Sequence, residues 1–290
     1  MNKKNYSPFA VVLIALLIAS TLNAVPSEME NKELKEFLTK CVAKCKECAQ
    51  AGDAEGQFLY GRALANGWGV KKDEAKAIEW YRKSAEQGNA SGQCYLGMCF
   101  VNGIGCETDT TNGVKWLRKA AEQDNTDAQY DLAWCYKLGE GVQKDVKQEA
   151  ELWAKAAKQG NVNAQYELAE CYYFGEGERK DDGKAIEWYH KAAMQGHSRA
   201  QYRLGLCYIE KGLDREIDVA MTTEWFRKAA ECFQKAADQG DIDAQYNLAK
   251  CYELGTGIEK DLAKAAEWYR KAASQGDADA KRKIEEGIGK

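Results

Sequence analysis

The chain has 290 residues, of which 45% are hydrophobic and 30% are charged, which is typical of a folded, water-soluble protein and excludes a disordered or membrane-embedded chain. The 41 Lys and Arg residues against 45 Asp and Glu residues give a net charge of -4, which argues against nucleic acid as a partner because nucleic-acid-binding surfaces are basic. Only two histidines are present, so a metal site or catalytic site built from several histidines is excluded.

The first 24 residues have the features of a secretory signal peptide. Lys3 and Lys4 precede an uncharged, mostly apolar run of 14 residues from Phe9 to Leu22, and Ala24 offers a small residue for cleavage. The run is shorter than the roughly 20 residues that a transmembrane helix needs. We therefore expect a protein exported to the periplasm or out of the cell, without membrane insertion after signal cleavage. An uncleaved N-terminal membrane anchor is the alternative.

Residues 25–51 are expected to form an N-terminal capping helix. Within it, Cys41, Cys45 and Cys48 follow one another at steps of four and three residues and so share one helix face. One interpretation is an apolar stripe that packs on the next element, because cysteine is among the most often buried residue types. The other is a redox or soft-metal patch, in which neighbouring lysines favour the thiolate form. Three cysteines without a fourth ligand do not make a zinc site.

Residues 52–276 contain one sequence unit six times. A Gln that follows Gly or Ala recurs at steps of 36 residues, with a single step of 44. Each unit has two stretches with apolar residues at three- and four-residue spacing, which predicts two helices. In five units a Gly-x-Gly loop separates them, since Gly readily ends a helix, and an Asp follows that can begin the second helix. The units lie near 52–87, 88–123, 124–159, 160–195, 196–239 and 240–275.

A single helix pair of this kind cannot bury its own Trp and Tyr side chains, whereas stacked pairs can. The sequence therefore predicts an all-α solenoid of six antiparallel helix pairs, closed at residues 277–290 by a polar capping helix. The fifth unit lacks the Gly-x-Gly loop and carries eight extra residues, in which a Trp-Phe-Arg-Lys-Ala-Ala segment is echoed seven residues later. Because seven residues make almost two helical turns, we expect a longer second helix there.

The repeated unit resembles the Sel-1-like repeat family, a relative of tetratricopeptide repeats. The resemblance rests on the Ala-x-x-x-Leu-Gly/Ala-x-x-Tyr start, the Gly-x-Gly loop, the Lys-Asp after it and the Trp-Tyr-x-Lys-Ala-Ala end. It implies a right-handed α/α superhelix that acts as an adaptor scaffold for protein complexes. The secreted cysteine-rich subgroup has a disulfide between the end of one helix pair and the start of the next. The corresponding positions here, of the Ala121 and Gln129 type, are not cysteine, so that framework is not carried over.

Five cysteines recur six residues after the repeat Gln. We expect them to pack in the core as small apolar side chains, and not to form a disulfide ladder, because equivalent positions of stacked pairs lie roughly 10 Å apart. A bridge between Cys232 and either Cys207 or Cys251 is left open. The five cysteines are Cys99, Cys135, Cys171, Cys207 and Cys251.

Candidate binding residues lie two and five positions after the repeat Gln, where the sequence varies freely between units and the side chains should face the inner curve. Aromatic and apolar anchors with acidic residues beside them suit a protein or peptide ligand bound along a concave groove. The candidate residues are Tyr95, Met98, Asp131, Trp134, Glu167 and Glu170.

Motifs for catalysis are missing from the sequence. No Ser is followed three residues later by Lys, and neither a paired-His zinc helix nor a phosphate-binding loop is present. We therefore predict a non-catalytic scaffold without cofactor or metal and leave its oligomeric state open. The alternative is a cell-wall-related hydrolase with penicillin-binding or weak β-lactamase activity, which the resemblance to the secreted cysteine-rich subgroup implies. A third interpretation is a redox sensor that uses the Cys41 cluster.

Overall fold

The structure is a computed structural model that describes residues 32–212 and 219–288, so the signal peptide predicted at residues 1–24 lies outside the described residues. Within the described ranges the chain forms fourteen helices and no strand. In chain order the helices are α2 (Lys32–Gln50), α3 (Ala54–Asn66), α4 (Glu74–Glu86), α5 (Ala90–Asn102), α6 (Thr110–Ala121), α7 (Thr126–Leu138), α8 (Val146–Lys158), α9 (Val162–Phe174), α10 (Asp182–Met194), α11 (Ser198–Gly212), α12 (Val219–Asp238), α13 (Ile242–Leu254), α14 (Leu262–Ser274) and α15 (Ala278–Glu285).

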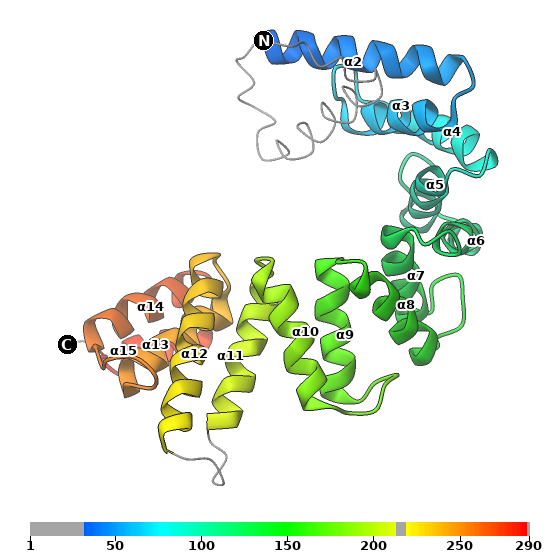
Figure 1. Ribbon diagram of the computed structural model, residues 1–290. Coiled ribbons are helices and arrows are strands. Elements are labelled where there is room, and N and C mark those ends of the chain that lie inside the picture. The colour runs from blue at the N-terminus through cyan, green and yellow to red at the C-terminus, as the bar shows by residue number, and fades with distance from the viewer. Residues whose placement is uncertain (1–31, 213–218, 289–290) are drawn as a thin grey trace, which may run out of the picture. The chain divides into compact units, whose positions relative to one another are not determined.

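Each repeat contributes two helices that follow one another along the chain (Figure 1). Helix α2 precedes the first pair, and α15 follows the last. This arrangement confirms the predicted all-α repeat superhelix of six helix pairs with a capping helix at each end. The pairs are α3/α4, α5/α6, α7/α8, α9/α10, α11/α12 and α13/α14.

The chain divides into two compact units, residues 1–152 and 153–290, and the boundary falls within α8. In the first unit each helix from α2 to α7 packs against the next one along the chain. In the second unit the same holds from α9 to α15. Each unit has its own cluster of buried side chains, which begins at Leu38 in the first unit and ends at Ala280 in the second. Nearest-neighbour contacts therefore build both cores, as expected for stacked repeats.

The second repeat shows how the sequence sets the helix ends. The side chain of Asn89 accepts the N–H of Gly92 at 2.7 Å and begins α5, and Asp109 accepts the N–H of Asn112 at 3.0 Å and begins α6. Between them, Gly103 ends α5 with a φ of 68°, a left-handed conformation that Gly adopts at little cost. The loop Gly and the Asp that follows it therefore act as predicted.

Small residues on the first helix of a pair allow the second helix to approach closely. A Cβ atom added to Gly61 would lie 2.7 Å from the ring of Tyr81, and one added to Gly97 would lie 2.8 Å from the side chain of Leu117. Both distances are too short for carbon atoms that are not bonded. The small residue and the large residue opposite it are therefore matched in size.

The repeat Gln forms a buried connection between successive pairs. The side chain of Gln245 donates to the carbonyl oxygen of Ala237 in the preceding repeat at 3.3 Å, and it accepts from the side chain of Gln275 at 2.8 Å. Because a buried amide needs partners for both its donor and its acceptor, this arrangement fixes how one pair stacks on the next. The same two bonds are made by Gln57, Gln93, Gln165 and Gln201.

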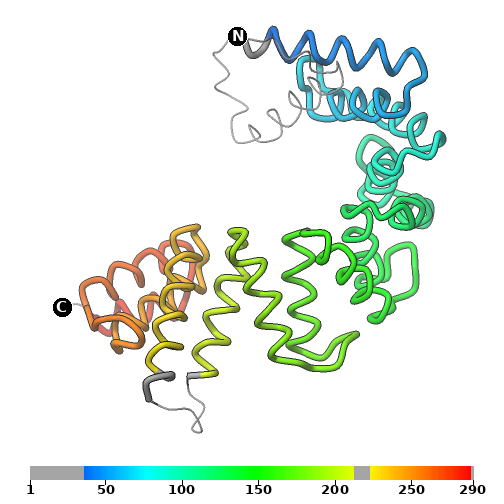
Figure 2. The backbone as a smooth tube through the Cα atoms, viewed as in Figure 1, coloured from blue at the N-terminus to red at the C-terminus, as the bar shows by residue number. Residues whose placement is uncertain are grey.

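Helix α12 in the fifth repeat has 20 residues, whereas α4, α10 and α14 have 13 each, which confirms the predicted longer second helix (Figure 2). Of the two similar segments, the second lies in the frame of the repeat. The ring of Phe233 packs where a Cβ on Gly205 would come within 2.6 Å, as Tyr81 packs on Gly61. The extra residues therefore extend α12 at its N-terminal end.

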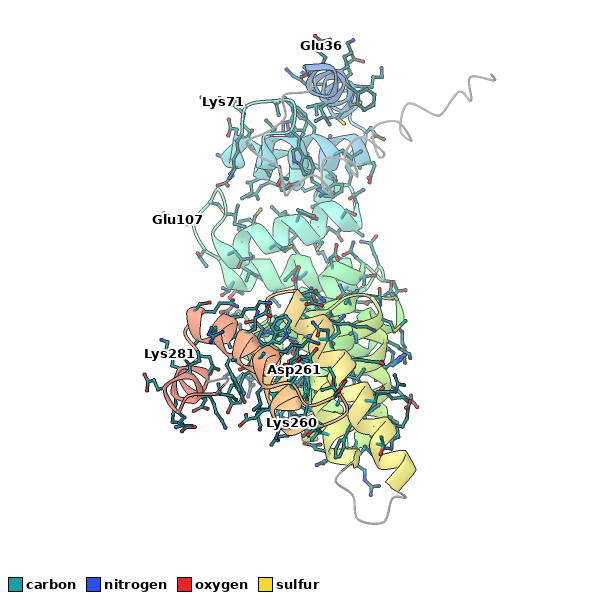
Figure 3. The ribbon with its side chains drawn as sticks, turned by 90° about the vertical axis from the view of Figure 1, so that its left-hand side faces the viewer. Glu36, Lys71, Glu107, Lys260, Asp261 and Lys281 are labelled. Atoms are coloured by element: carbon teal, nitrogen blue, oxygen red, sulfur yellow. The ribbon has the colours of Figure 1, made fainter. Side chains whose placement is uncertain are left out.

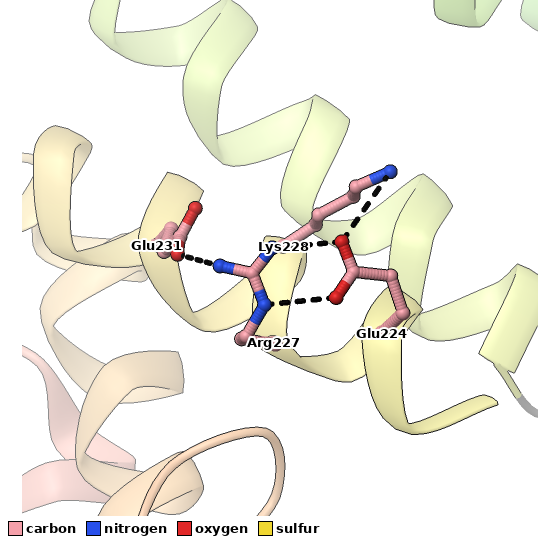
Figure 4. A network of polar contacts seen from close by, with 4 residues as sticks. All are labelled: Glu224, Arg227, Lys228 and Glu231. Carbon is pink, nitrogen blue, oxygen red and sulfur yellow. Dashed lines mark hydrogen bonds and ion pairs between the residues drawn. The ribbon is translucent and has the colours of Figure 1, made fainter. Parts of the chain in front are cut away.

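Ion pairs follow the exposed side of this longer helix (Figure 4). Arg227 bonds to Glu224 at 2.7 Å, one turn earlier, and also to Glu231, one turn later. Lys228 lies 3.7 Å from Glu224. Such pairs at three- and four-residue spacing support the helix only weakly, because solvent screens exposed charges.

Exposed charged side chains occupy the loops within the helix pairs (Figure 3). Lys71 lies in the loop after α3, and Glu107 lies in the loop after α5. Lys260 and Asp261 precede α14. None of the helices in the described ranges combines the length and apolar character that are required to cross a bilayer.

Candidate functional site

Three of the candidate binding residues meet at one pocket of the first unit. Met98 of α5 and Asp131 and Trp134 of α7 line a cavity of about 210 Å³. Met98 lies five residues after the repeat Gln of its unit, and Asp131 lies two residues after the repeat Gln of the next unit. The two positions face each other because α5 and α7, the first helices of successive repeats, lie next to one another. The pocket is completed by Val101, Asn102, Leu117, Cys135, Leu138 and Glu140.

Asp131 is one of the two acidic residues that line this pocket, together with Glu140. Among the described residues, no hydrogen bond or ion pair holds its carboxyl group. Burial, and to a lesser degree the negative charge of Asp127, raise the pKa of Asp131 to about 7. The carboxyl group therefore holds its proton more readily than an exposed Asp does, and a cation beside it would favour the charged form.

Trp134 provides a large aromatic surface beside this carboxyl group. It is half-buried, and its ring meets the ring of Tyr130 edge-on at 6.4 Å. The Nζ atom of Lys137 lies 4.7 Å from the centre of the Trp134 ring. Met98 is also half-buried on the facing helix. The pocket thus combines apolar walls with an acidic group.

Tyr95 does not line this pocket. Its ring packs edge-on against the ring of Phe58 at 5.2 Å and lies 5.4 Å from the guanidinium carbon of Arg62. Burial raises the pKa of Tyr95. The single aromatic patch expected from Tyr95, Met98 and Trp134 is therefore divided between two places in the first unit, because Tyr95 turns toward the preceding repeat.

Arg62 is a residue that the sequence analysis did not include among the candidates. Its guanidinium group lies 5.1–5.9 Å from the ring centres of Phe58, Trp68 and Tyr95, and its Nε atom is buried without a hydrogen-bond partner in the described residues. The aromatic rings thus hold a positive charge by cation–π contacts rather than by an ion pair. No sequence signal marks this arrangement, since Trp68 belongs to the loop.

Glu167 and Glu170 belong to the second unit. Glu167 is buried. Glu170 lies 2.9 Å from Arg203 of the next repeat and also accepts the hydroxyl hydrogen of Tyr189. The negative charge of Glu170 is therefore balanced within its own unit, unlike that of Asp131.

The three cysteines of α2 face the core rather than solvent. The side chains of Cys41 and Cys45 are buried, and that of Cys48 is half-buried. Burial raises the pKa of Cys41 and raises the pKa of Cys45 to about 12, so both thiols stay protonated at neutral pH. Lys44 is paired with Glu47 at 2.7 Å. Burial thus opposes the thiolate form that the redox hypothesis requires.

The repeated cysteine column is buried, as predicted, with exposed fractions of 3–6%. The thiols of Cys207, Cys232 and Cys251 are free, so the bridge left open at Cys232 is not formed. In the ranges that the structure covers, no three His, Cys, Asp or Glu side chains are arranged to hold a metal ion.

Stacked helix pairs with a 36-residue period define an α-solenoid repeat protein. The chain belongs to the Sel1 repeat family, whose model, described as Sel1 repeat, matches it six times. The matched residues are 54–89, 90–125, 126–161, 162–197, 198–241 and 242–277.

Two solved structures resemble the chain along most of its length. A protective antigen of uropathogenic Escherichia coli strains, described as displaying an SLR fold, is 33% identical with a TM-score of 0.74 and covers 96% of this chain. This chain spans only 56% of that antigen's length. A Sel1 repeat protein from Oxalobacter formigenes is 28% identical with a TM-score of 0.68, over 90% of this chain and 96% of its own. No curated protein matches the chain significantly.

Proposed function

We propose that this protein is an exported, non-catalytic scaffold that binds a protein or peptide through the first helices of its first unit. Sel1 repeats generally mediate protein interactions. The observation that supports this binding face is the pocket of Met98, Asp131 and Trp134, in which an unpaired carboxyl group lies beside a half-buried aromatic ring. Aromatic anchors in partly desolvated pockets contribute much of the binding energy at protein interfaces.

Removing this aromatic anchor tests the proposed binding face. We expect Trp134→Ala to keep the helical circular-dichroism signal but to recover less of a partner in affinity capture from the native compartment. A Trp-to-Ala loss at an interface anchor typically costs about 2 kcal/mol or more, roughly a 30-fold loss of affinity.

The matched control is Trp268→Ala, since Trp268 is a half-buried Trp of the second unit whose ring stacks with Lys271. This variant should recover every partner at the wild-type level. Unchanged recovery by Trp134→Ala would contradict the proposed binding face.

Export is supported by the signal-like segment before Val25. If the segment is cleaved after Ala24, the protein recovered from the periplasm or medium begins at Val25, which intact-mass measurement and N-terminal sequencing can establish. A protein that retains residues 1–24 and sediments with membranes would instead support the N-terminal anchor. Recovery of the uncleaved chain from the cytoplasm would contradict export.

The hydrolase predicted as an alternative is not part of this proposal, because no contact or pocket in the described residues favours it. The family is generally one of non-catalytic scaffolds.

A further inference from the structure

The pocket of the first unit differs from the corresponding place in the fourth and fifth repeats. In α9 and α11, the residues at the same offsets are Glu170 and Arg203, whose side chains form an ion pair at 2.9 Å. In α5 and α7 they are Met98 and Asp131, so the acid faces a methionine and no base. At equivalent positions, the second unit therefore has an acid paired with a base, Glu170 and Arg203, whereas the first unit has an acid without a base, Asp131.

The lining of the pocket adds a second acid and no base. Glu140, in the loop after α7, is the other ionisable carboxylate of the lining, and the remaining walls are mainly apolar. An apolar pocket that carries negative charge is complementary to a Lys or Arg side chain. Such a side chain can bury its aliphatic stem against apolar walls while its charged group pairs with a carboxylate.

We infer that this pocket binds a single basic side chain, Lys or Arg, of a partner peptide, with the aliphatic stem between Met98 and Trp134 and the charged group at the Asp131 carboxylate. This inference rests on the proposed function and specifies the chemistry of the ligand. The cavity of about 210 Å³ has room for one such side chain.

The titration of Asp131 agrees with this assignment and predicts its pH dependence. The groups that surround Asp131 are Asp127 and Cys135 on α7, Cys94 and Tyr95 on α5 and Glu140 in the following loop, whereas α6 contributes the apolar Leu117. None of these groups is a base. Because only the carboxylate attracts a cation, affinity should rise with pH through about 7 and level off above it.

The test uses the full chain and capped pentapeptides, acetyl-Gly-Gly-X-Gly-Gly-amide, in which X is lysine, arginine, norleucine or glutamate. Binding is followed at pH 8 by nuclear magnetic resonance chemical shifts of the Trp134 and Asp131 signals. We expect the lysine and arginine peptides to bind roughly tenfold more tightly than the norleucine peptide, because only they can form a charge-assisted hydrogen bond with the carboxylate. The glutamate peptide should bind least.

Two variants separate the pocket from general charge effects. Asp131→Asn should lower the affinity for the lysine peptide roughly tenfold and remove its pH dependence. Glu86→Gln makes the same change of net charge at an exposed residue of α4 outside the pocket, and it should bind as the wild type does. Nuclear magnetic resonance spectra of the variants report whether the fold is kept.

The inference is overturned if the lysine peptide binds no better than the norleucine peptide, or if Asp131→Asn binds it with unchanged affinity. In that case, loss of partner capture by the Trp134 variant would still support a scaffold with another ligand chemistry. Unchanged capture together with absent peptide binding would refute both proposals.

Discussion

At the scale of single residues, whether a carboxyl group is paired depends on whether a neighbouring repeat provides a base. Asp131 and Glu170 are both acids on first helices, but Glu170 has Arg203 within 2.9 Å, whereas Asp131 has only burial and another acid nearby. A carboxyl group whose pKa is raised in the folded state favours folding less as the pH increases. Asp131 should therefore destabilise the protein at alkaline pH.

The stability of Asp131→Asn follows from this shift. The pKa of Asp131 is about 7 in the folded protein, against about 3.9 in an unfolded chain, so the wild-type carboxyl group costs stability progressively from about pH 4 to about pH 7 and fully above it. We expect Asp131→Asn to unfold at higher urea concentration than the wild type at pH 8, by about 1–3 kcal/mol.

At pH 4 the two proteins should differ much less, because the carboxyl group is protonated in both the folded and much of the unfolded state. Urea denaturation at both pH values measures the difference. An equal difference at pH 4 and pH 8 would show that ionisation of Asp131 is not its cause.

At the scale of elements, the buried amide of the repeat Gln decides how helix pairs join. It links a carbonyl oxygen of the preceding repeat to a Gln at the end of its own second helix, so a single side chain spans two repeats. The bonds recur with donor–acceptor distances of 3.1–3.3 Å and 2.7–2.8 Å in five repeats. The spacing of the repeats is thus set by a polar contact as well as by apolar packing.

Gln245→Leu tests the energetic role of this contact. Leucine has a similar size, but it leaves the Ala237 carbonyl oxygen and the Gln275 amide without their partner. We expect a loss of about 1–3 kcal/mol in the free energy of unfolding, which is the usual range for an unsatisfied buried polar group. Gln148→Leu, at an exposed position of α8, is the control and should change stability by less than about 0.5 kcal/mol. Thermal and urea denaturation compare the two, and equal effects would assign the buried amide no special role.

At the scale of the whole molecule, the repeats form two units that each contain a continuous series of packed helices. Every repeat uses the same core positions, and the offsets on the first helices are among the positions that vary between repeats. In the first unit these offsets leave an acid and a caged guanidinium without partners of opposite charge, whereas in the second unit Glu170 and Arg203 neutralise each other. These two groups are the unbalanced charges of the binding face that we propose in the first unit.

The sequence by itself determined the number of helix pairs, their loops, the lengthened α12 and the burial of the recurring cysteines. These features depend on local spacing: a 3.6-residue period assigns each side chain to a helix face, and a Gly or Asp at a fixed offset ends or begins a helix. The sequence also predicted Met98, Asp131 and Trp134 as candidate binding residues, because their positions two or five residues after the repeat Gln lie on the same side of successive helices.

Only the tertiary structure decided which of these side chains meet. The cage around Arg62, the pairing of Glu170 with Arg203 and the separation of Tyr95 from the pocket all depend on how far one helix pair is displaced along the next. The pKa of Asp131 depends on the same geometry, since burial and nearby charges come from several elements at once. Helical periodicity predicts the direction in which a side chain points from its own helix axis. Contacts of 3–6 Å between repeats also depend on the distance and the stagger between helix axes, which are set by how the helices pack.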